Sequence, residues 1–207
     1  MTEKRAVIIS GGHVEDYVYI RSFIIPGDMV ICADRGYEHA RRMSLEIEAL
    51  VGDFDSLGYI PDGVNTVSLP AKKDLTDTEY AIQYARKQGC RDFLLLGCTG
   101  ARMDHALSNI LHLCVMLDRG ERGIIIDEHS KIMITRTVIH LYEPQRTIIS
   151  LIPLSPCSGV TTSGLEYPLD KSALAVGSSL GVSNVMTAER AEVKLESGTL
   201  LVIVARD

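Results

Sequence analysis

Residues 93–105 of the chain read FLLLGCTGARMDH, an apolar run followed by a glycine-containing turn. The four successive apolar residues Phe93–Leu96 predict a strand that is covered on both faces, as in a parallel sheet. Apolar residues recur at helical spacing after the turn and predict a helix over residues 104–117. We expect its inner face to carry Leu107, Ile110, Leu111, Cys114 and Val115. A strand, a turn and a helix in this order are typical of an α/β fold.

The same alternation of apolar strands and amphipathic helices extends over the first 130 residues. Further near-continuous apolar runs predict buried strands at residues 6–9, 29–32, 66–69 and 123–126. Residues 74–88 predict another helix, which begins with a capping box formed by Thr76 and Glu79. We therefore expect an N-terminal, Rossmann-like α/β domain built on a parallel sheet.

The pattern changes near residue 128, after which no helical periodicity is found. Short strand candidates occupy residues 132–134, 138–141, 147–151, 191–195 and 200–204. Clusters of Pro, Gly and Ser separate several of them, as in residues 153–159 and 177–183. We expect two domains, an α/β domain over residues 1–128 and a small antiparallel β-sandwich over residues 129–207.

Composition and charge narrow the possible classes of function. The chain has 207 residues, 46% apolar and 23% charged, so we expect a globular core. Its net charge of −6 disfavours sequence-independent binding of nucleic acid, which needs a cationic face. The sequence has no signal-like N-terminus and no apolar run near the ~20 residues that span a bilayer, so we expect no membrane attachment. The five cysteines contain no CxxC pair, which favours free thiols in a reducing cytoplasm.

Two carboxylates follow the apolar step at residues 51–52. Asp53 and Asp55 stand at positions i and i+2, and in an extended segment both side chains point the same way. Carboxylates that point together repel each other unless a cation lies between them, and hard oxygen ligands suit Mg²⁺. The alternative interpretation is an acidic turn that caps a helix.

Another charged group precedes the helix of residues 74–88. Lys73, Asp74 and Asp77 lie where a helix N-terminus attracts phosphate, and Asp77 is placed to reach a shared metal ion. The alternative role for Asp74 or Thr76 is N-capping of that helix.

Two further segments have the residue types of binding loops. The turn over residues 97–105 is neither a Walker A loop nor GxGxxG, but its Arg102 offers a planar fork for a phosphoryl oxygen. In the second half, Ser183 and Asn184 place donors and acceptors on a predicted loop. The alternative for that loop is an ordinary hairpin turn.

Five motifs occur in order along the chain: ADRG at residues 33–36, GDFDS at 52–56, KDLTD at 73–77, residues 97–105 with Asn109, and GVSN at 181–184. In this combination the chain resembles the thiamine pyrophosphokinase family from about residue 8 to its C-terminus. GDFDS followed by KDxTD and GxRxDH is far more specific than any of the motifs alone.

The resemblance implies an enzyme, ATP:thiamine diphosphotransferase, that transfers pyrophosphate from MgATP to the thiamine hydroxyl and releases AMP. It implies Mg²⁺ bound by Asp53, Asp55 and Asp77, with Arg102 joining them in catalysis. It also implies a homodimer in which each site lies between an α/β domain and the partner's β domain. The substrate-binding set that it implies is Asp34, Lys73, Asp74, Thr99, Gly100, Arg102, Asp104, His105, Asn109, Ser183 and Asn184.

Three features depart from the pattern of that family. Arg35 stands where a small residue is usual, Ala101 replaces a common glycine, and the chain has no Trp, although some members carry one after the Ser-Asn pair. Two other functions compete with the implied one. They are another metal-dependent phosphotransferase or phosphohydrolase, and a non-catalytic thiamine or nucleotide sensor. The three acidic positions argue against the sensor, because a pure binder gains little from carboxylates that repel each other.

Overall fold

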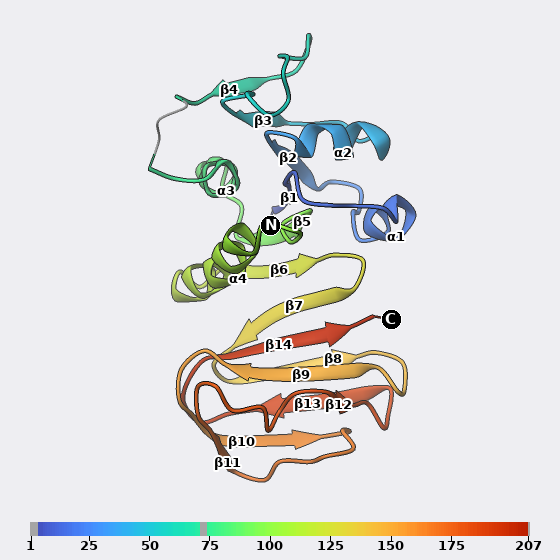
Figure 1. Cartoon of the computed structure of the whole chain (residues 1–207), viewed down its shortest axis with the longest axis vertical. Coiled ribbons are helices and arrows are strands. Elements are labelled where there is room, and N and C mark those ends of the chain that lie inside the picture. Colours follow the sequence, from blue (N-terminus) through green and yellow to red (C-terminus); the bar gives the residue numbers. More distant parts are fainter. Residues whose placement is uncertain (1–3, 71–73, 207) are drawn as a thin grey trace. The chain divides into compact units, whose positions relative to one another are not determined.

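The computed structural model describes residues 4–70 and 74–206 and divides the chain into two units, Met1–Glu128 and His129–Asp207 (Figure 1). The first unit contains strands and helices, whereas the described residues of the second contain strands and turns only. This confirms the expected fold class, a parallel α/β domain followed by an antiparallel β-sandwich.

A parallel sheet forms the centre of the first unit. Its strands are β1 (Arg5–Ile9), β2 (Met29–Ala33), β3 (Ala49–Gly52), β4 (Thr66–Ser68), β5 (Asp92–Leu96) and β6 (Arg122–Ile126). Strand β1 pairs with β2 on one side and with β5 on the other, and the order is β6-β5-β1-β2-β3-β4. The chain therefore builds the sheet away from β1 in one direction and then in the other. The strand order reverses between β1 and β5, and we call this place the switch point. Loops that leave the carboxyl ends of β1 and β5 diverge there, and open α/β sheets bind ligands at such points.

Helices cover both faces of this sheet. They are α1 (Tyr17–Arg21), α2 (Gly36–Arg42), α3 (Asp77–Lys87) and α4 (Met103–Asp118). Figure 1 shows α1 and α2 on one face and α3 and α4 on the other. Alternate residues of β1 serve the two faces, and Val7 and Ile9 share an apolar cluster with Ile20 of α1 and Ala40 of α2. None of the helices in the described residues is long and apolar enough to cross a membrane.

All five strands predicted in the first unit are present, and both predicted helices are confirmed. Helix α3 begins at Asp77, three residues later than expected, and the Thr76 hydroxyl accepts a hydrogen bond from the Glu79 backbone N–H (3.2 Å). The sequence did not reveal β3, α1 or α2. Helices α1 and α2 have 5 and 7 residues, too few to show a helical period, and the apolar run of β3 is short, Ala49–Val51.

The inner face predicted for α4 was wrong for three of its five residues, whereas Ile110 and Cys114 are half-buried. Leu107, Leu111 and Val115 are 52%, 44% and 42% exposed, whereas the buried residues of α4 are Ala106, Leu113 and Met116. Apolar residues surround most of this helix, so periodicity alone did not identify the buried side. The face is set by Gly123 of β6, where a Cβ would lie 2.4 Å from the Met116 sulfur and 2.8 Å from Leu113 Cδ2. Because Gly123 has no side chain, the strand leaves room for the large side chains of Leu113 and Met116 on the helix.

Two antiparallel sheets form the second unit, as expected of a sandwich. One has the order β12-β9-β14-β7, with β7 (Ser130–Thr135), β9 (Ile148–Pro153), β12 (Asn184–Val185) and β14 (Leu200–Ala205). The other has the order β11-β10-β13-β8, with β8 (Val138–Tyr142), β10 (Cys157–Ser163), β11 (Ser172–Leu174) and β13 (Arg190–Lys194). Residues of both sheets, among them Leu151, Val160, Val193 and Val202, share one core. The five predicted strands are confirmed. Strands β10, β11 and β12 were missed because they are short or rich in small polar residues.

All five cysteines lie in the described residues and are free thiols, as the sequence predicted. Four of them are buried, and burial raises the pKa of the Cys98 thiol to about 12. Burial therefore keeps Cys98 protonated and unreactive at neutral pH.

Replacing Leu113, which is fully buried, tests the observed face of α4. We expect Leu113→Ala to lower the free energy of unfolding by about 2–5 kcal/mol, because it opens a cavity between α4 and β6. Leu111→Ala, on the exposed side, should cost less than about 1 kcal/mol. Urea denaturation followed by circular dichroism measures both. Equal losses would contradict the orientation of α4.

Candidate active site

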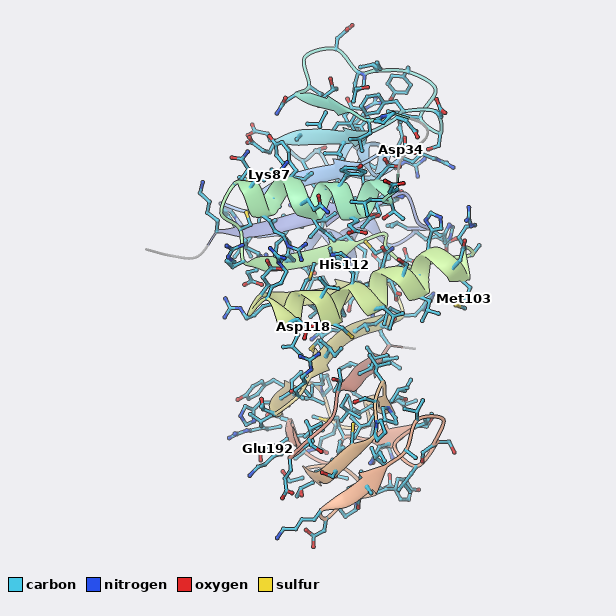
Figure 2. All side chains as sticks on the ribbon, turned by 90° about the vertical axis from the view of Figure 1, so that its left-hand side faces the viewer. Asp34, Lys87, Met103, His112, Asp118 and Glu192 are labelled. Atoms are coloured by element: carbon cyan, nitrogen blue, oxygen red, sulfur yellow. The ribbon has the colours of Figure 1, made fainter. Side chains whose placement is uncertain are left out.

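A cleft of about 1190 Å³ opens at the carboxyl ends of the parallel strands. Loops that follow β1, β2, β3 and β5 line it, together with the first turns of α3 and α4. In Figure 2, Asp34 lies toward the Met103 end of α4, whereas Lys87 and Asp118, which end α3 and α4, lie on the opposite side. The cleft thus occupies the switch point between β1 and β5, where the fold predicts a ligand.

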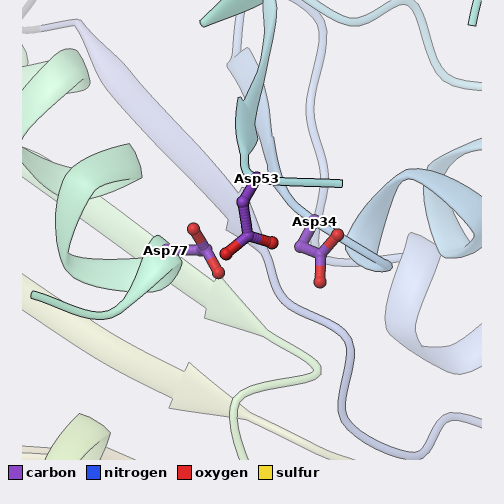
Figure 3. Close-up of side chains that lie close together, drawn as sticks. All are labelled: Asp34, Asp53 and Asp77. Carbon is purple, nitrogen blue, oxygen red and sulfur yellow. The ribbon is translucent and has the colours of Figure 1, made fainter. Parts of the chain in front are cut away.

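Three carboxylates meet in this cleft. Asp34 follows β2, Asp53 follows β3 and Asp77 begins α3, and one oxygen of each lies within 4.8 Å of the others. Figure 3 shows the side chain of Asp53 between those of Asp77 and Asp34. Oxygen Oδ1 of Asp34 is buried and has no hydrogen-bond partner, while Oδ2 accepts one from the Ser56 hydroxyl. An orphaned carboxylate oxygen beside two other carboxylates fits a divalent cation that prefers oxygen ligands, such as Mg²⁺.

The backbone around these residues is bent to bring them together. Asp34 and Phe54 have φ angles of +47° and +64°, in the left-handed region that residues other than glycine rarely adopt. The Asp34 N–H donates to the Val51 carbonyl (2.9 Å), which ties the end of β2 to β3. Strain of this kind gathers at functional sites, where the surrounding structure maintains it.

The grouping of Asp55 with Asp53 was wrong in its premise, because the segment is not extended. The left-handed Phe54 turns the chain, and the Asp55 N–H donates to Asp53 Oδ1 (3.2 Å). Asp55 is exposed and lies outside both the lining of the cleft and the carboxylate cluster. Asp34, which the resemblance placed in the substrate-binding set, takes its place in the cluster.

Two glycine loops pack backbone to backbone beside the carboxylates. The Gly12 N–H donates to the Gly97 carbonyl (2.8 Å), and a Cβ at Gly12 would lie 2.1 Å from the Thr99 carbonyl oxygen. Any side chain at Gly12 would force the two loops apart. Sequence reasoning found the turn at residues 97–105 and missed the pair Gly11-Gly12, although a glycine pair directly after the first strand was a usable signal.

Several predicted binding residues are gathered by the second of these loops. Thr99, Gly100, Arg102, His105 and Asn109 all line the cleft. The Asn109 amide donates to the Cys98 carbonyl (2.8 Å) and the Thr99 hydroxyl to Asp127 (2.7 Å), so both side chains support the turn.

Arg102 and Asp104 are exposed and bonded to each other. The Arg102 Nε and Nη2 atoms donate to the two Asp104 oxygens at 2.9 and 2.5 Å. This contact holds the pKa of the Asp104 carboxyl well below its usual range. Asp104 lies outside the lining of the cleft, whereas Arg102 is part of it. Arg102 therefore presents a charged, exposed guanidinium at the cleft, held by one carboxylate.

The other predicted residues are Lys73, Asp74, Ser183 and Asn184. Lys73 lies outside the described residues, and Asp74 is exposed and absent from the lining. Ser183 and Asn184 belong to the second unit. Asn184 is only 3% exposed; its side chain accepts from the N–H groups of Tyr167 (3.0 Å) and Val185 (2.9 Å) and donates to the Tyr167 carbonyl (2.7 Å). Its amide is thus used inside the unit, whereas Ser183 is exposed, with φ +57°.

A buried chain of hydroxyl and thiol groups lies at the base of the cleft. The hydroxyls of Ser10 and Thr78 are 2.8 Å apart, and the Cys98 thiol donates to Ser10 Oγ (3.3 Å). Ser10 follows β1, Cys98 follows β5, and Thr78 stands directly after Asp77 in α3. These two hydrogen bonds therefore anchor the start of α3, and with it Asp77, to the centre of the sheet.

Two family models match the sequence. The model described as "Thiamin pyrophosphokinase, catalytic domain" matches residues 21–125, and the one described as "Thiamin pyrophosphokinase, vitamin B1 binding domain" matches residues 136–200. The chain belongs to the thiamin pyrophosphokinase family. The cleft described above, apart from the residues that follow β1, falls within the first of these matches.

Individual relatives lead to the same family. The thiamine pyrophosphokinase of Bacillus subtilis is 28% identical over 172 residues, which cover 79% of this chain and 80% of that protein. Thiamine pyrophosphokinase 1 of Oryza sativa subsp. japonica is 25% identical, with 80% of this chain and 69% of that protein covered.

Solved structures of the family share the fold. The crystal structure of thiamine pyrophosphokinase from Bacillus subtilis matches with a TM-score of 0.87 at 24% identity, covering 99% of this chain and 100% of that one. That of thiamin pyrophosphokinase from Geobacillus thermodenitrificans matches with a TM-score of 0.83 at 25% identity, covering 98% of each chain.

Substitution of Thr78 tests whether the buried hydroxyl chain positions Asp77 in this family member. Thr78→Val keeps the shape of the side chain but removes its hydrogen bond with the Ser10 hydroxyl. We expect the Mg²⁺ concentration for half-maximal activity to rise roughly three- to tenfold, the scale of one buried hydrogen bond. Thr78→Ser should restore it. An unchanged Mg²⁺ requirement in Thr78→Val would show that Asp77 does not depend on this bond.

Proposed function

We propose that the cleft of the first unit binds MgATP and transfers its terminal pyrophosphoryl group to the hydroxyl of thiamine, releasing AMP. Thiamine pyrophosphokinase activity is the reaction of the family to which the chain belongs. The observation that carries the proposal for this cleft is the carboxylate cluster of Asp34, Asp53 and Asp77 beside a glycine turn, at the switch point of the sheet.

Asp34, Asp53 and Asp77 are the residues proposed to hold Mg²⁺. Their three carboxylates carry a charge that a divalent cation would balance, and the orphaned Oδ1 of Asp34 supplies a ligand that no protein donor satisfies. Bound Mg²⁺ would neutralise part of the charge on the transferring phosphates. This set replaces Asp55 of the sequence-based set with Asp34, because Asp34 is the residue that the fold brings to the other two.

The rest of the site is proposed to orient the substrates. Arg102 can exchange its contact with Asp104 for a phosphoryl oxygen, and its planar fork suits two parallel hydrogen bonds. Backbone of the turn around Gly100 lies next to it for close approach of phosphate. Phosphoryl-type transfer asks little covalent chemistry of a protein, so alignment and charge carry most of the catalysis.

The second unit is proposed to contribute thiamine contacts, and its match to a vitamin B1 binding domain supports this. Ser183 is exposed and suited to such a contact, whereas the Asn184 amide is occupied inside the unit. We further propose a homodimer in which each site combines the cleft of one copy with the β unit of the other. The nucleotide motifs lie in one unit and Ser183 in the other, which favours such sharing. Five free cysteines favour a reducing, cytoplasmic location.

Product analysis tests the reaction directly. The protein is incubated with MgATP, with and without thiamine, and the products are separated by chromatography. We expect thiamine diphosphate and AMP in equal amounts, formed only when thiamine is present. Release of ADP or phosphate without thiamine would instead indicate another phosphotransferase or a phosphohydrolase, and binding without turnover would indicate a sensor.

Charge-neutral variants test the metal ligands. Asp34→Asn and Asp53→Asn should each lower turnover about 10²-fold or more, because each removes a charged ligand while nearly preserving shape. Asp62→Asn is the control, since Asp62 is an exposed acid in the segment after β3 and lies outside the cleft. Turnover is measured over a range of Mg²⁺ concentrations, with circular dichroism to check folding. Full activity of Asp34→Asn together with a large loss in Asp55→Asn would restore the sequence-based set.

A mixing experiment tests the shared site. Asp53→Asn and Ser183→Arg, each inactive alone, are unfolded together and refolded as a mixture. If sites are shared, each mixed dimer has one site with both lesions and one with none, so activity should return to roughly a quarter of wild type. Light scattering and mass spectrometry establish that mixed dimers form. Mixed dimers without activity would place complete sites within single chains.

A further inference from the structure

His39 of α2 bridges two other segments of the first unit at the edge of the cleft. Its Nε2 atom is 2.7 Å from the Gly12 carbonyl oxygen, and its Nδ1 atom is 2.8 Å from the Tyr17 hydroxyl. Arg42 Nη1 donates to the same hydroxyl (2.9 Å), and its guanidinium carbon lies 5.5 Å from the centre of the Tyr17 ring. All four residues line the cleft.

The donor and the acceptor of each hydrogen bond in this network can be assigned. A carbonyl oxygen only accepts, so His39 Nε2 must carry the hydrogen that it donates to Gly12. In the neutral ring Nδ1 is then an acceptor, and the Tyr17 hydroxyl donates to it. The Tyr17 oxygen in turn accepts from Arg42, which only donates. The geometry therefore selects the neutral Nε2–H tautomer of His39.

The bond from His39 adds to the backbone bonds that hold the segment after β1. Gly12 belongs to the glycine pair that interlocks with the turn at residues 97–100, where its N–H is already bonded to the Gly97 carbonyl. Glycine has the freest backbone of all residues, so a fixed orientation here must come from its neighbours. His39 bonds to the Gly12 carbonyl and so fixes the second backbone polar group of Gly12.

The charges that face His39 favour its neutral form. Arg42 of α2 and Arg35, which precedes α2, lower the pKa of His39, whereas the hydrogen bond to the Gly12 carbonyl and the charge of Glu38 raise it. Burial is the largest cause, and it lowers the pKa of His39 below its ordinary value of 6.5. Protonation at Nδ1 would aim a second donor at the Tyr17 oxygen beside Arg42.

We propose that neutral His39, held as its Nε2–H tautomer by Tyr17, is a positioning residue that sets the Gly11-Gly12 loop against the glycine turn that receives ATP, and that acid releases it. This rests on the proposed function for its effect on ATP, but not for the tautomer. Because burial lowers the pKa of His39, the neutral ring and its two hydrogen bonds are intact above about pH 6.5. They are lost as the pH falls through the lowered pKa of the folded protein.

Nuclear magnetic resonance tests the tautomer without any assay of activity. Long-range ¹H–¹⁵N correlations of protein labelled with ¹⁵N-histidine distinguish Nε2–H from Nδ1–H rings, and His39→Gln identifies the signal of His39. We expect the Nε2–H form at pH 8 and a midpoint of protonation below the ordinary histidine value. Tyr17→Phe should move that midpoint upward, because it removes the donor to Nδ1 that opposes protonation. An Nδ1–H ring, or an unshifted midpoint in Tyr17→Phe, would overturn the proposal.

Kinetics test the positioning role. His39→Leu should raise the KM for ATP about tenfold at pH 8, the scale of one lost hydrogen bond, and leave the KM for thiamine within about twofold. His39→Gln keeps an N–H for the Gly12 carbonyl and should recover most of the loss. In the wild type, kcat/KM for ATP should fall below about pH 6.5, and His39→Gln should lack this part of the decline because it does not titrate.

The control variant is His140→Gln, which changes an exposed histidine of the second unit that pairs with Glu192. It should keep the wild-type KM for ATP and the wild-type pH profile. If His39→Leu fails to fold, His39→Gln and the pH profile still test the role. Equal pH profiles for the wild type and His39→Gln would overturn it. If the protein makes no thiamine diphosphate at all, the proposed function fails while the tautomer test stands.

Discussion

The parallel pairing of β1 with β2 on one side and β5 on the other decides where every loop of the active site lies. Parallel strands end at the same edge of a sheet, so the segments that follow them emerge together. At β1 the neighbouring connections leave in opposite directions, and a crevice remains between them. The carboxylates come from the β2 and β3 ends and from α3, whereas the glycine loops come from the β1 and β5 ends. One edge therefore supplies the carboxylate cluster on one side and the backbone of the glycine loops on the other.

Close approach of backbone is the second constraint. The loops at residues 11–12 and 97–100 touch through main-chain atoms, which is possible only because Gly12 has no side chain. Such a contact provides little packing of its own, and polar side chains behind the loops compensate. His39 bonds to the Gly12 carbonyl, Asn109 to the Cys98 carbonyl, and Thr99 to Asp127. These residues shape the site through the backbone that they support.

Charge within the cleft is costly in the absence of a ligand. Three carboxylates lie within 4.8 Å, one of their oxygens is buried without a partner, and Asp34 has a left-handed backbone. Each feature opposes folding, and the apolar cluster beneath the sheet together with the Ser10–Thr78 bond opposes that cost. A bound cation would relieve the first two costs, whereas the left-handed backbone of Asp34 is held by the surrounding structure.

The sequence by itself determined the fold class, the long strands and helices, and the family, because these depend on local periodicity and on motifs several residues long. Some short elements were not predicted: α1 and α2 are too brief to show a helical period, and the apolar run of β3 is only Ala49–Val51. Tertiary structure alone decided which side of α4 is buried, since the space above Gly123 selects Leu113 and Met116. It also placed Asp34 instead of Asp55 in the cluster, where Asp34 and Phe54 have left-handed backbones, and turned the Asn184 amide inward. Motifs specify which side chains are present. Where each one points depends on backbone angles and on neighbours distant in the chain, and these are set only when the chain has folded.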